Sequence, residues 1–375
     1  MNRVLFAGGG TGGHLYPALN LADALRAERP EAAVHFVGAR RGIEARVLPE
    51  RGAPHTLLPL EPLRRDRVWR NWRLLPAAVG GARGLHRLFR AFSPALVVGT
   101  GGYASGPACV WALLRGVPVA LQEQNSYPGL TTRELSRWAR QVHLGFPEAE
   151  QHLRTGRATR VFVLGNPIRP PDRTVDRREG RRALGLPERG TVLLVVGGSQ
   201  GARAINDALA DALEGVARGS LAPRPRGLHV LWATGPSHVD GIRAHLAGTA
   251  LEAWVTPVGY IDRMDRALAA ADLALSRAGA MATAEFLAWG VPAVLVPLPT
   301  AAADHQSHNA RALDEAGAAI HLPQPELTPE RLWHEVAALA VDAERRAAMA
   351  KAAQARARPD AARRIVRRLL EVVEA

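Results

Sequence analysis

Short apolar runs rich in β-branched residues alternate along the chain with longer segments of helical periodicity. This alternation is typical of βαβ units, in which parallel strands are joined by helices that cross a face of the sheet. The expected strands of the first half are 4–7, 34–37, 96–99, 117–121 and 161–164. Those of the second half are 192–196, 228–232, 273–276 and 293–296. The pattern predicts an α/β protein with mostly parallel sheets.

The two halves begin alike, each with a buried strand, a glycine turn that holds a hydroxyl residue, and a helix. Residues 4–14 read VLFAGGGTGGH, and residues 193–202 read LLVVGGSQGA. A chain of 375 residues is long for a single core. The stretch 165–171, GNPIRPP, can form neither a helix nor an inner strand. We therefore predict two doubly wound Rossmann-like domains, 1–165 and 166–357, with a C-terminal helix (about 358–375) that rejoins the first.

Glycine-rich turns between a strand and a helix bring backbone N–H groups and a helix N-terminus close to a phosphate. The turn 8–13 also fits a dinucleotide site or plain tight packing. A dinucleotide site calls for an acidic residue at the end of the second strand, and 34–40 offers none, which argues against a dehydrogenase. A third glycine cluster, GTGGYASGP, occupies 99–107. Several such turns suggest that more than one phosphate is bound.

Polar residues follow other expected strands, where this fold places its ligand sites. Residues 122–125 read QEQN, and 276–292 read SRAGAMATAEFLAWGVP, a strand end, a glycine bend and a helix that Gly290 and Pro292 stop. Glu285 falls more than one turn into that helix, where it can accept hydrogen bonds from a diol such as a ribose. A solvated helix carboxylate is the alternative. The glycine bend and the polar run DHQSHN at 304–309 favour the ligand site.

In this order, the motifs GGGTGGH, GGYASGP, EQN, GNPIR and GGSQGA and the Glu285 helix resemble the MurG family, the N-acetylglucosaminyltransferases that add the second sugar to lipid I in peptidoglycan synthesis. The resemblance covers essentially the whole chain. It implies a GT-B fold, two doubly wound domains facing across a cleft, with the membrane-bound acceptor on the first and UDP-N-acetylglucosamine mainly on the second. It also implies inversion at the anomeric carbon as the C4 hydroxyl of N-acetylmuramic acid displaces UDP to give lipid II, a step in cell wall biogenesis, cell shape and division.

The candidate catalytic residues are His14 and Glu123. His14 can take the acceptor proton near neutral pH, or it can hydrogen-bond a phosphate or close the helix start. Glu123 is the second candidate base. In place of the His that the family usually has, this chain carries Gln122, so proton transfer there is excluded and hydrogen bonding remains. The expected substrate-binding residues are Thr11, Gly12, Gly13, Asn125, Arg169, Ser199, Ile261, Ala280, Met281, Ala282, Thr283, Ala284, Glu285 and Gln306.

Neither a metal nor another cofactor is expected. No Asp-x-Asp occurs in the sequence, so the usual metal-holding pair of the other glycosyltransferase fold is missing. The charge of the leaving group would be met by helix N-termini, glycine-turn amides and Arg169.

Charge and composition indicate the partners. The net charge is +13, and residues 1–165 hold 22 arginines against 11 acidic residues. Cations mix with aromatic and aliphatic residues in 64–75 and 111–115, which suits an anionic lipid surface. A solvated arginine-rich face is the alternative; a nucleic-acid partner is not expected, since no nucleic-acid module is present.

The expected location is the cytoplasmic side of the cell membrane, bound peripherally. The N-terminus reads as a strand rather than a signal peptide, and no uncharged stretch approaches the ~20 residues of a spanning helix. The single cysteine, Cys109, excludes an intrachain disulfide and fits a buried small side chain in a reducing compartment. Three other functions stay open: a GT-B transferase with another lipid acceptor, a nucleotide-sugar epimerase, and a non-catalytic nucleotide-binding scaffold.

Overall fold

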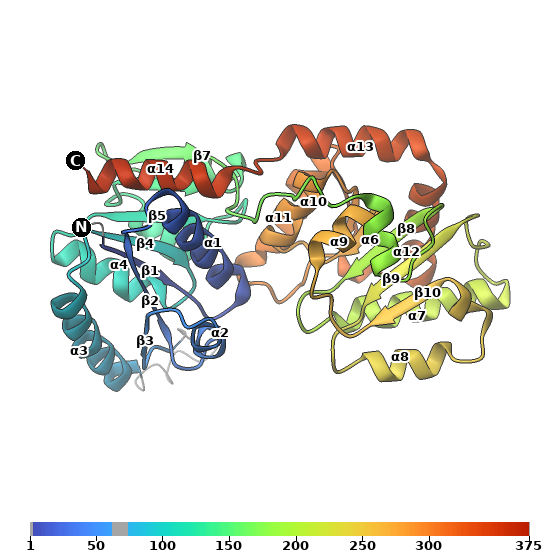
Figure 1. Cartoon of the computed structure of the whole chain (residues 1–375), viewed down its shortest axis with the longest axis horizontal. Coiled ribbons are helices and arrows are strands. Elements are labelled where there is room, and N and C mark those ends of the chain that lie inside the picture. The colour runs from blue at the N-terminus through green and yellow to red at the C-terminus, as the bar shows by residue number, and fades with distance from the viewer. Residues whose placement is uncertain (1–2, 62–73, 375) are drawn as a thin grey trace. The chain divides into compact units, whose positions relative to one another are not determined.

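The computed structural model describes residues 3–61 and 74–374 and forms two compact units (Figure 1). The first contains Met1–Arg169 together with Arg358–Ala375, and the second contains Pro170–Ala357. Each unit is built on its own parallel sheet.

The sheet of the first unit has seven strands in the order β3-β2-β1-β4-β5-β6-β7. The strands are β1 (Arg3–Gly8), β2 (Ala33–Ala39), β3 (His55–Leu58), β4 (Leu96–Gly101), β5 (Val119–Glu123), β6 (Gln141–Leu144) and β7 (Arg160–Val163). All neighbouring pairs are parallel. The direction of winding reverses between β1 and β4, and such a switch point is where open α/β sheets bind ligands.

Helices cover both faces of this sheet. They are α1 (Gly12–Glu28), α2 (Glu44–Glu50), α3 (Leu74–Phe92), α4 (Ser105–Leu114), α5 (Leu130–Leu135), the 3-10 helix η2 (Pro147–His152) and α14 (Ala361–Val373). Alternate residues of β1 enter different cores: Phe6 packs with α1, α2 and α14, and Leu5 packs with α3, α4 and α5. This period of two is what a strand covered on both faces requires.

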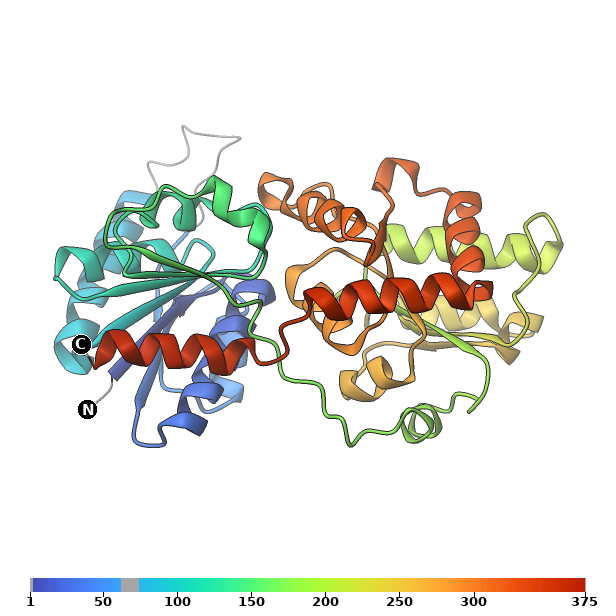
Figure 2. The same ribbon diagram turned by 90° about the horizontal axis from the view of Figure 1, so that it is seen from above.

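The C-terminal helix α14 completes the core of the first unit. Figure 2 shows it lying along that unit. It packs beside α1, and Ile365, Val366 and Leu369 are buried there. Arg367 also pairs with Glu28 at 3.3 Å. The last helix of the chain therefore stabilises the same layer as the first.

The second unit has a six-stranded parallel sheet in the order β10-β9-β8-β11-β12-β13. The strands are β8 (Thr191–Val196), β9 (Leu228–Ala233), β10 (Val255–Val258), β11 (Leu273–Ser276), β12 (Ala293–Leu295) and β13 (Ala319–His321). The helices are α6 (Arg177–Ala183), α7 (Arg203–Arg218), α8 (Val239–Leu246), α9 (Met264–Ala270), α10 (Ala280–Trp289), α11 (His305–Glu315), α12 (Pro329–Val341) and α13 (Ala343–Arg356), with 3-10 turns η3 (Ala250–Ala253), η4 (Ala302–Asp304) and η5 (Gln324–Glu326). The predicted class, two doubly wound parallel-sheet domains, is confirmed.

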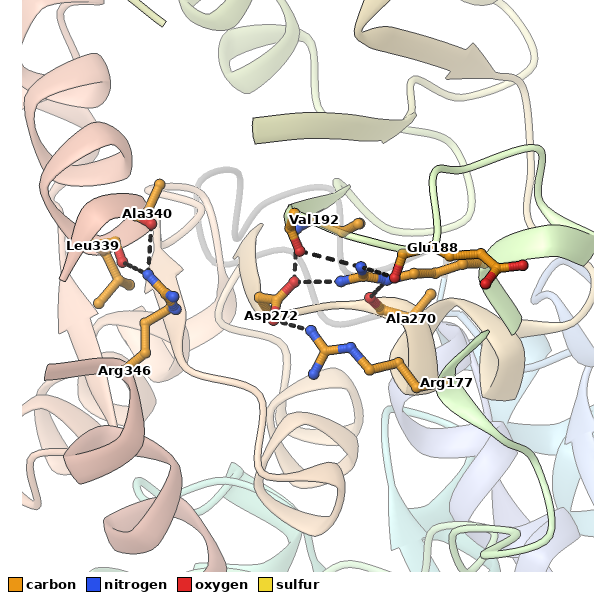
Figure 3. A network of polar contacts seen from close by, with 10 residues as sticks. Arg177, Glu188, Val192, Ala270, Asp272, Leu339, Ala340 and Arg346 are labelled. Carbon is orange, nitrogen blue, oxygen red and sulfur yellow. Dashed lines mark hydrogen bonds and ion pairs between the residues drawn. The ribbon is translucent and has the colours of Figure 1, made fainter. Parts of the chain in front are cut away.

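A buried ion pair fixes the start of the second unit (Figure 3). Asp272, just before β11, accepts hydrogen bonds from Arg177, from Arg181 Nη2 at 2.7 Å and from Val192 N at 2.7 Å. Arg181 is 2% exposed and also donates to three backbone carbonyls. Because all three nitrogen atoms of this side chain donate hydrogen bonds, the arrangement holds α6 against the end of α9 and the segments that lead into β8 and β11. Burial lowers the pKa of Arg181 to about 10, so it stays charged at neutral pH.

Four strands were missed by the sequence pattern. β3, β10 and β13 lie at sheet edges, and β10 contains Pro257, which an edge strand tolerates because one side makes no ladder bonds. β6 reads Gln-Val-His-Leu and is fully buried, with its two polar side chains bonded to each other. The expected start of the fifth strand at residue 117 was wrong, since β5 begins at Val119, directly after Pro118.

Candidate active site

The first glycine turn joins β1 to α1 and presents His14 in the first turn of the helix. Thr11 is the N-cap residue, but its side chain makes no capping hydrogen bond to the backbone. Its Oγ1 instead lies 3.1 Å from His14 Nδ1. Thr11 and Gly13 are exposed, whereas Gly12 and His14 are half-buried. The predicted residues of this turn therefore stand together, with the imidazole oriented by the threonine hydroxyl.

The glycine cluster 99–107, at the end of β4, packs directly on the His14 ring. A Cβ atom at Gly101 would lie 2.7 Å from His14 Cδ2, and Gly101 has a φ of +93°. Only glycine fits both the contact and the backbone angle. Thr100, which is fully buried, donates from Oγ1 to the carbonyl oxygen of His14 at 2.8 Å. The end of β4 thus fixes both the backbone and the ring of this histidine.

Behind the histidine lies a chain of buried amides. Gln124 Nε2 donates to Thr100 O at 3.0 Å, and Asn166 Nδ2 donates to Gln124 O at 2.9 Å. Gln122 Nε2 is 3.4 Å from Asn166 Oδ1, and the Gln122 side chain is fully buried. The position at which this chain departs from the family it resembles therefore contributes hydrogen bonds beneath the site. Thr100, Gln124 and Asn166 were not predicted as site residues, although all three lie within motifs described above.

Glu123 is buried, and both of its oxygens accept hydrogen bonds. Oε1 accepts from Asn125 N at 3.1 Å and Asn125 Nδ2 at 3.2 Å, and Oε2 accepts from Gly129 N at 2.9 Å. Gly129 is the N-cap residue of α5. Glu123 thus orients Asn125 and the start of α5.

One further histidine, His143, and the cysteine Cys109 also belong to this sheet and its helices, but neither is suited to proton transfer or nucleophilic attack. Burial, and next the charge of Arg368, lowers the pKa of His143 to about 3. Burial raises the pKa of Cys109 to about 12, in keeping with a small core residue.

Arg169 ends the first unit, and its side chain is exposed after the buried Ile168.

In the second unit, the predicted residues follow the carboxyl ends of β8, β10, β11 and β12. Ser199 is exposed in the turn after β8, and Ile261 is buried in the segment after β10. The register pairs Ser276 with both Val196 and Leu295, so these strands end at one edge of the sheet. The structure therefore brings the predicted donor residues of this unit to one edge.

Helix α10 starts at the glycine bend and ends at the predicted stop, with Gly290 as its C-cap. Ala280 and Thr283 are buried, whereas Met281, Ala282, Ala284 and Glu285 are half-buried. Thr283 Oγ1 donates to Ala280 O at 3.1 Å, inside the helix. Glu285 therefore lies on the side that is less covered by the core, and Thr283 lies on the packed side.

The loop after β12 is tied to the bend before α10. Gln306 Oε1 accepts from Leu298 N at 3.0 Å, and Asn309 Nδ2 donates to Ala278 O at 3.1 Å. Arg277 Nη1 donates to the carbonyl oxygens of Val296 and Pro297. Desolvation by burial lowers the pKa of Arg277. These hydrogen bonds fix α10 and α11 relative to each other.

A basic and apolar surface lies on α3 and α4, which pack against each other. Leu114 is 77% exposed, and Val79 and Val110 are also exposed. The guanidinium of Arg115 lies 5.3 Å from the centre of the Trp111 ring. Of the predicted stretch 64–75, residues 64–73 and the side chains of 74 and 75 lie outside the described residues.

The described part of the chain contains neither a cluster of metal-binding side chains nor a helix that could span a membrane. No group of three or more His, Cys, Asp or Glu side chains could hold a metal ion there. Within the same ranges, 3–61 and 74–374, no helix has both the length and the hydropathy needed to span a bilayer.

Comparisons with known proteins agree with this organisation. The model of the glycosyltransferase family 28 N-terminal domain matches residues 4–144, and that of the C-terminal domain matches residues 192–365. A protein of Salinibacter ruber is 44% identical over 99% of this chain and 97% of its own. One of Moorella thermoacetica is 42% identical over 99% of both chains. Both are named UDP-N-acetylglucosamine–N-acetylmuramyl-(pentapeptide) pyrophosphoryl-undecaprenol N-acetylglucosamine transferase.

Among solved structures, the crystal structure of Acinetobacter baumannii MurG is similar over 99% of this chain and 100% of its own. Its TM-score is 0.77 and its sequence identity is 28%. The similarity therefore extends through both units.

Proposed function

The chain belongs to glycosyltransferase family 28, and we propose that it transfers N-acetylglucosamine from UDP-N-acetylglucosamine to lipid I. The acceptor atom is the C4 hydroxyl oxygen of N-acetylmuramic acid, carried as its pentapeptide on undecaprenyl pyrophosphate, and the product is lipid II. The observation that carries this proposal is the 44% identity, over nearly the full length, with a relative named for this donor and acceptor. The relatives described above are named for this transfer, which favours it over an epimerase or a non-catalytic scaffold.

We propose His14 as the general base. The C4 oxygen forms a bond to the anomeric carbon while the bond from that carbon to the β-phosphate oxygen breaks, so the configuration inverts and UDP leaves. The proton of the C4 hydroxyl passes to Nε2 of His14. Nε2 has a lone pair only in the tautomer that carries its proton on Nδ1, and Thr11 Oγ1, at 3.1 Å, is placed to accept that proton in a hydrogen bond.

For the donor, we propose that Glu285 holds the ribose hydroxyls. The start of α10 and the turn at Ser199 meet the diphosphate through backbone N–H groups, and Arg169 adds charge for the leaving group. Gln306 binds a sugar hydroxyl. Because its Oε1 accepts from Leu298 N, its Nε2 is the end that can donate to the sugar.

We also propose that the protein binds anionic lipid on the cytoplasmic side of the cell membrane, and that the reaction needs no metal. Exposed Leu114 beside Arg115 and Trp111 supports the lipid contact, because aliphatic side chains enter the headgroup region while cations attract its phosphates. The expected attraction is on the order of 1 kcal/mol per cation and is screened by salt.

The proposed reaction is tested with purified protein, labelled UDP-N-acetylglucosamine and a lipid I analogue, with and without EDTA. We expect labelled disaccharide lipid in both cases. The matched control is the same analogue with its C4 hydroxyl replaced by hydrogen, which should give no labelled lipid. Transfer to diacylglycerol but not to the lipid I analogue would contradict the proposed acceptor. Loss of transfer in EDTA, restored by one divalent ion, would contradict the metal-free reaction.

A further inference from the structure

A buried carboxylate lies directly under the first glycine turn. Glu44 begins α2, and its side chain is completely buried. Its Oε2 accepts a hydrogen bond from Gly10 N at 2.8 Å, and its Oε1 accepts one from Ala39 N at 2.8 Å. The carboxylate thus connects the turn after β1 with the end of β2.

Three glycines make room for this carboxylate. A Cβ atom at Gly9, at Gly38 or at Gly42 would overlap carbon or oxygen atoms of the Glu44 side chain. These residues come from the turn after β1, from β2 and from the loop after it. Since any side chain at these positions would displace the carboxylate, the surrounding segments fit together only with it in place.

The contact bears on His14 through the backbone. Gly10 has a φ of +88°, and on its other side a Cβ atom would lie 2.7 Å from Tyr103 Cε1. Gly10 is therefore held between Tyr103 and the bond to Glu44, immediately before Thr11. The Gly10 N–H, which points at Glu44, is also not available to a phosphate. Part of the first glycine turn thus binds an internal anion.

We propose that Glu44 is a positioning residue of the transferase, which holds the turn at Gly10 so that Thr11 and His14 keep their catalytic geometry. This proposal rests on the proposed role of His14 as the base. Glu44 has no contact with the reacting atoms in this role and acts only through the backbone of the turn. Replacing one carboxylate oxygen by an amide turns an acceptor into a donor that faces an N–H group, so the turn must shift.

The test compares Glu44→Gln with Glu50→Gln, a control at the exposed end of the same helix. Misplacement of a catalytic group by about 1 Å can cost on the order of 100-fold in rate, so we expect Glu44→Gln to lower kcat roughly 10- to 100-fold. Glu50→Gln should retain the parent kcat. UDP affinity should stay within about twofold in both variants, since the proposed UDP contacts are made by the second unit and Arg169, and the thermal unfolding midpoint checks that the first unit folds.

A double-mutant cycle separates positioning from a general structural defect. If Glu44 acts through His14, adding Glu44→Gln to His14→Ala should reduce kcat by less than about twofold further. An equal fold loss in both backgrounds, or a parent-like kcat in Glu44→Gln, would overturn the proposal. Gly42→Ala, which displaces the carboxylate without removing it, should lower kcat in the same non-additive way; a parent-like kcat there would also count against it.

These results are distinguishable from failure of the proposed function. If His14→Ala retains the parent kcat, the assignment of the base fails, whatever Glu44→Gln does. If the parent protein makes no labelled disaccharide lipid, the proposed reaction fails. With an active parent and an impaired His14→Ala variant, either an independent effect of Glu44→Gln or a parent-like kcat in Glu44→Gln would reject the positioning role alone.

Discussion

Thr11→Val tests whether a hydroxyl fixes the tautomer of His14. Threonine at an N-cap usually accepts a hydrogen bond from the helix backbone, and losing that bond costs about 1 kcal/mol of stability. Here the Thr11 side chain makes no such bond, and its hydroxyl lies 3.1 Å from His14 Nδ1. Valine keeps the branched shape, and the extended backbone of residue 11 (φ −134°, ψ 161°) suits it. The substitution should therefore leave helix stability nearly unchanged.

The expected effect is on the rate. A hydrogen bond that is partly open to water contributes about 0.5–1.5 kcal/mol, and without it the tautomer with a lone pair on Nε2 is less populated by that free energy. The corresponding loss of kcat is roughly two- to twelvefold. Affinity for UDP should not change, because the proposed UDP contacts are made by the second unit and Arg169, and not by Thr11.

The assay measures kcat, UDP affinity and the thermal unfolding midpoint of Thr11→Val, with Thr11→Ser as the control that keeps the hydroxyl. We expect the serine variant to stay close to the parent in kcat. Equal losses in both variants would show that the methyl group matters rather than the hydrogen bond. A parent-like kcat in Thr11→Val would refute the tautomer argument, and a large drop in the unfolding midpoint would show that Thr11 caps the helix after all.

Four further results are expected. His14→Ala should lower kcat by roughly 10²–10⁴ and flatten the acidic limb of the rate profile, whereas a purely phosphate-binding role would lower affinity and keep the limb. Glu285→Ala should weaken UDP binding by ~1–3 kcal/mol in calorimetry, and an unchanged affinity would reject the ribose contact. Leu114→Gln should weaken binding to anionic vesicles about fivefold, equivalent to about 1 kcal/mol, while the exposed Val341→Gln in the second unit should not. The pKa of His143 is lowered to about 3, so below about pH 6.5 the unfolded chain binds a proton that the folded chain does not bind. The free energy of unfolding should therefore fall on the order of 1.4 kcal/mol per pH unit below about 6.5. Denaturant unfolding at pH 7, 6 and 5 measures this, and a free energy that does not change with pH would contradict it.

The part of the fold that sequence predicts is the part set by local patterning. β1, β4 and β8 are continuous apolar runs with period-two packing into two cores, and they were predicted close to their observed bounds. Strand order is not a local property, so no pattern within a strand could place β1 next to β4. β6 was missed because its polar residues His143 and Gln141, which hydrogen-bond to each other inside the sheet, make the isolated segment look like a loop.

Candidate site residues could be predicted where suitable chemistry coincides with a position at a strand end. His14, Glu123 and Glu285 follow strand ends, and the structure places each at the carboxyl edge of its own sheet. Glu44 was not predicted. It lies just beyond residues 34–40, where a dinucleotide site would have an acidic residue at the end of the second strand. It lies five residues beyond Ala39, and the glycine bends of the intervening loop return it to the strand end. Such a return depends on tertiary contacts, which residue spacing alone does not specify.

The linkage of the disaccharide product tests the central claim most directly. After incubation of the protein with UDP-N-acetylglucosamine and a lipid I analogue, the purified lipid is examined by NMR for the configuration of the new bond and for the carbon of N-acetylmuramic acid that carries it. The account predicts a single β linkage to C4, because the α-linked donor sugar is displaced from the opposite face by that hydroxyl. An α linkage, attachment at another carbon, or no disaccharide lipid at all would contradict it.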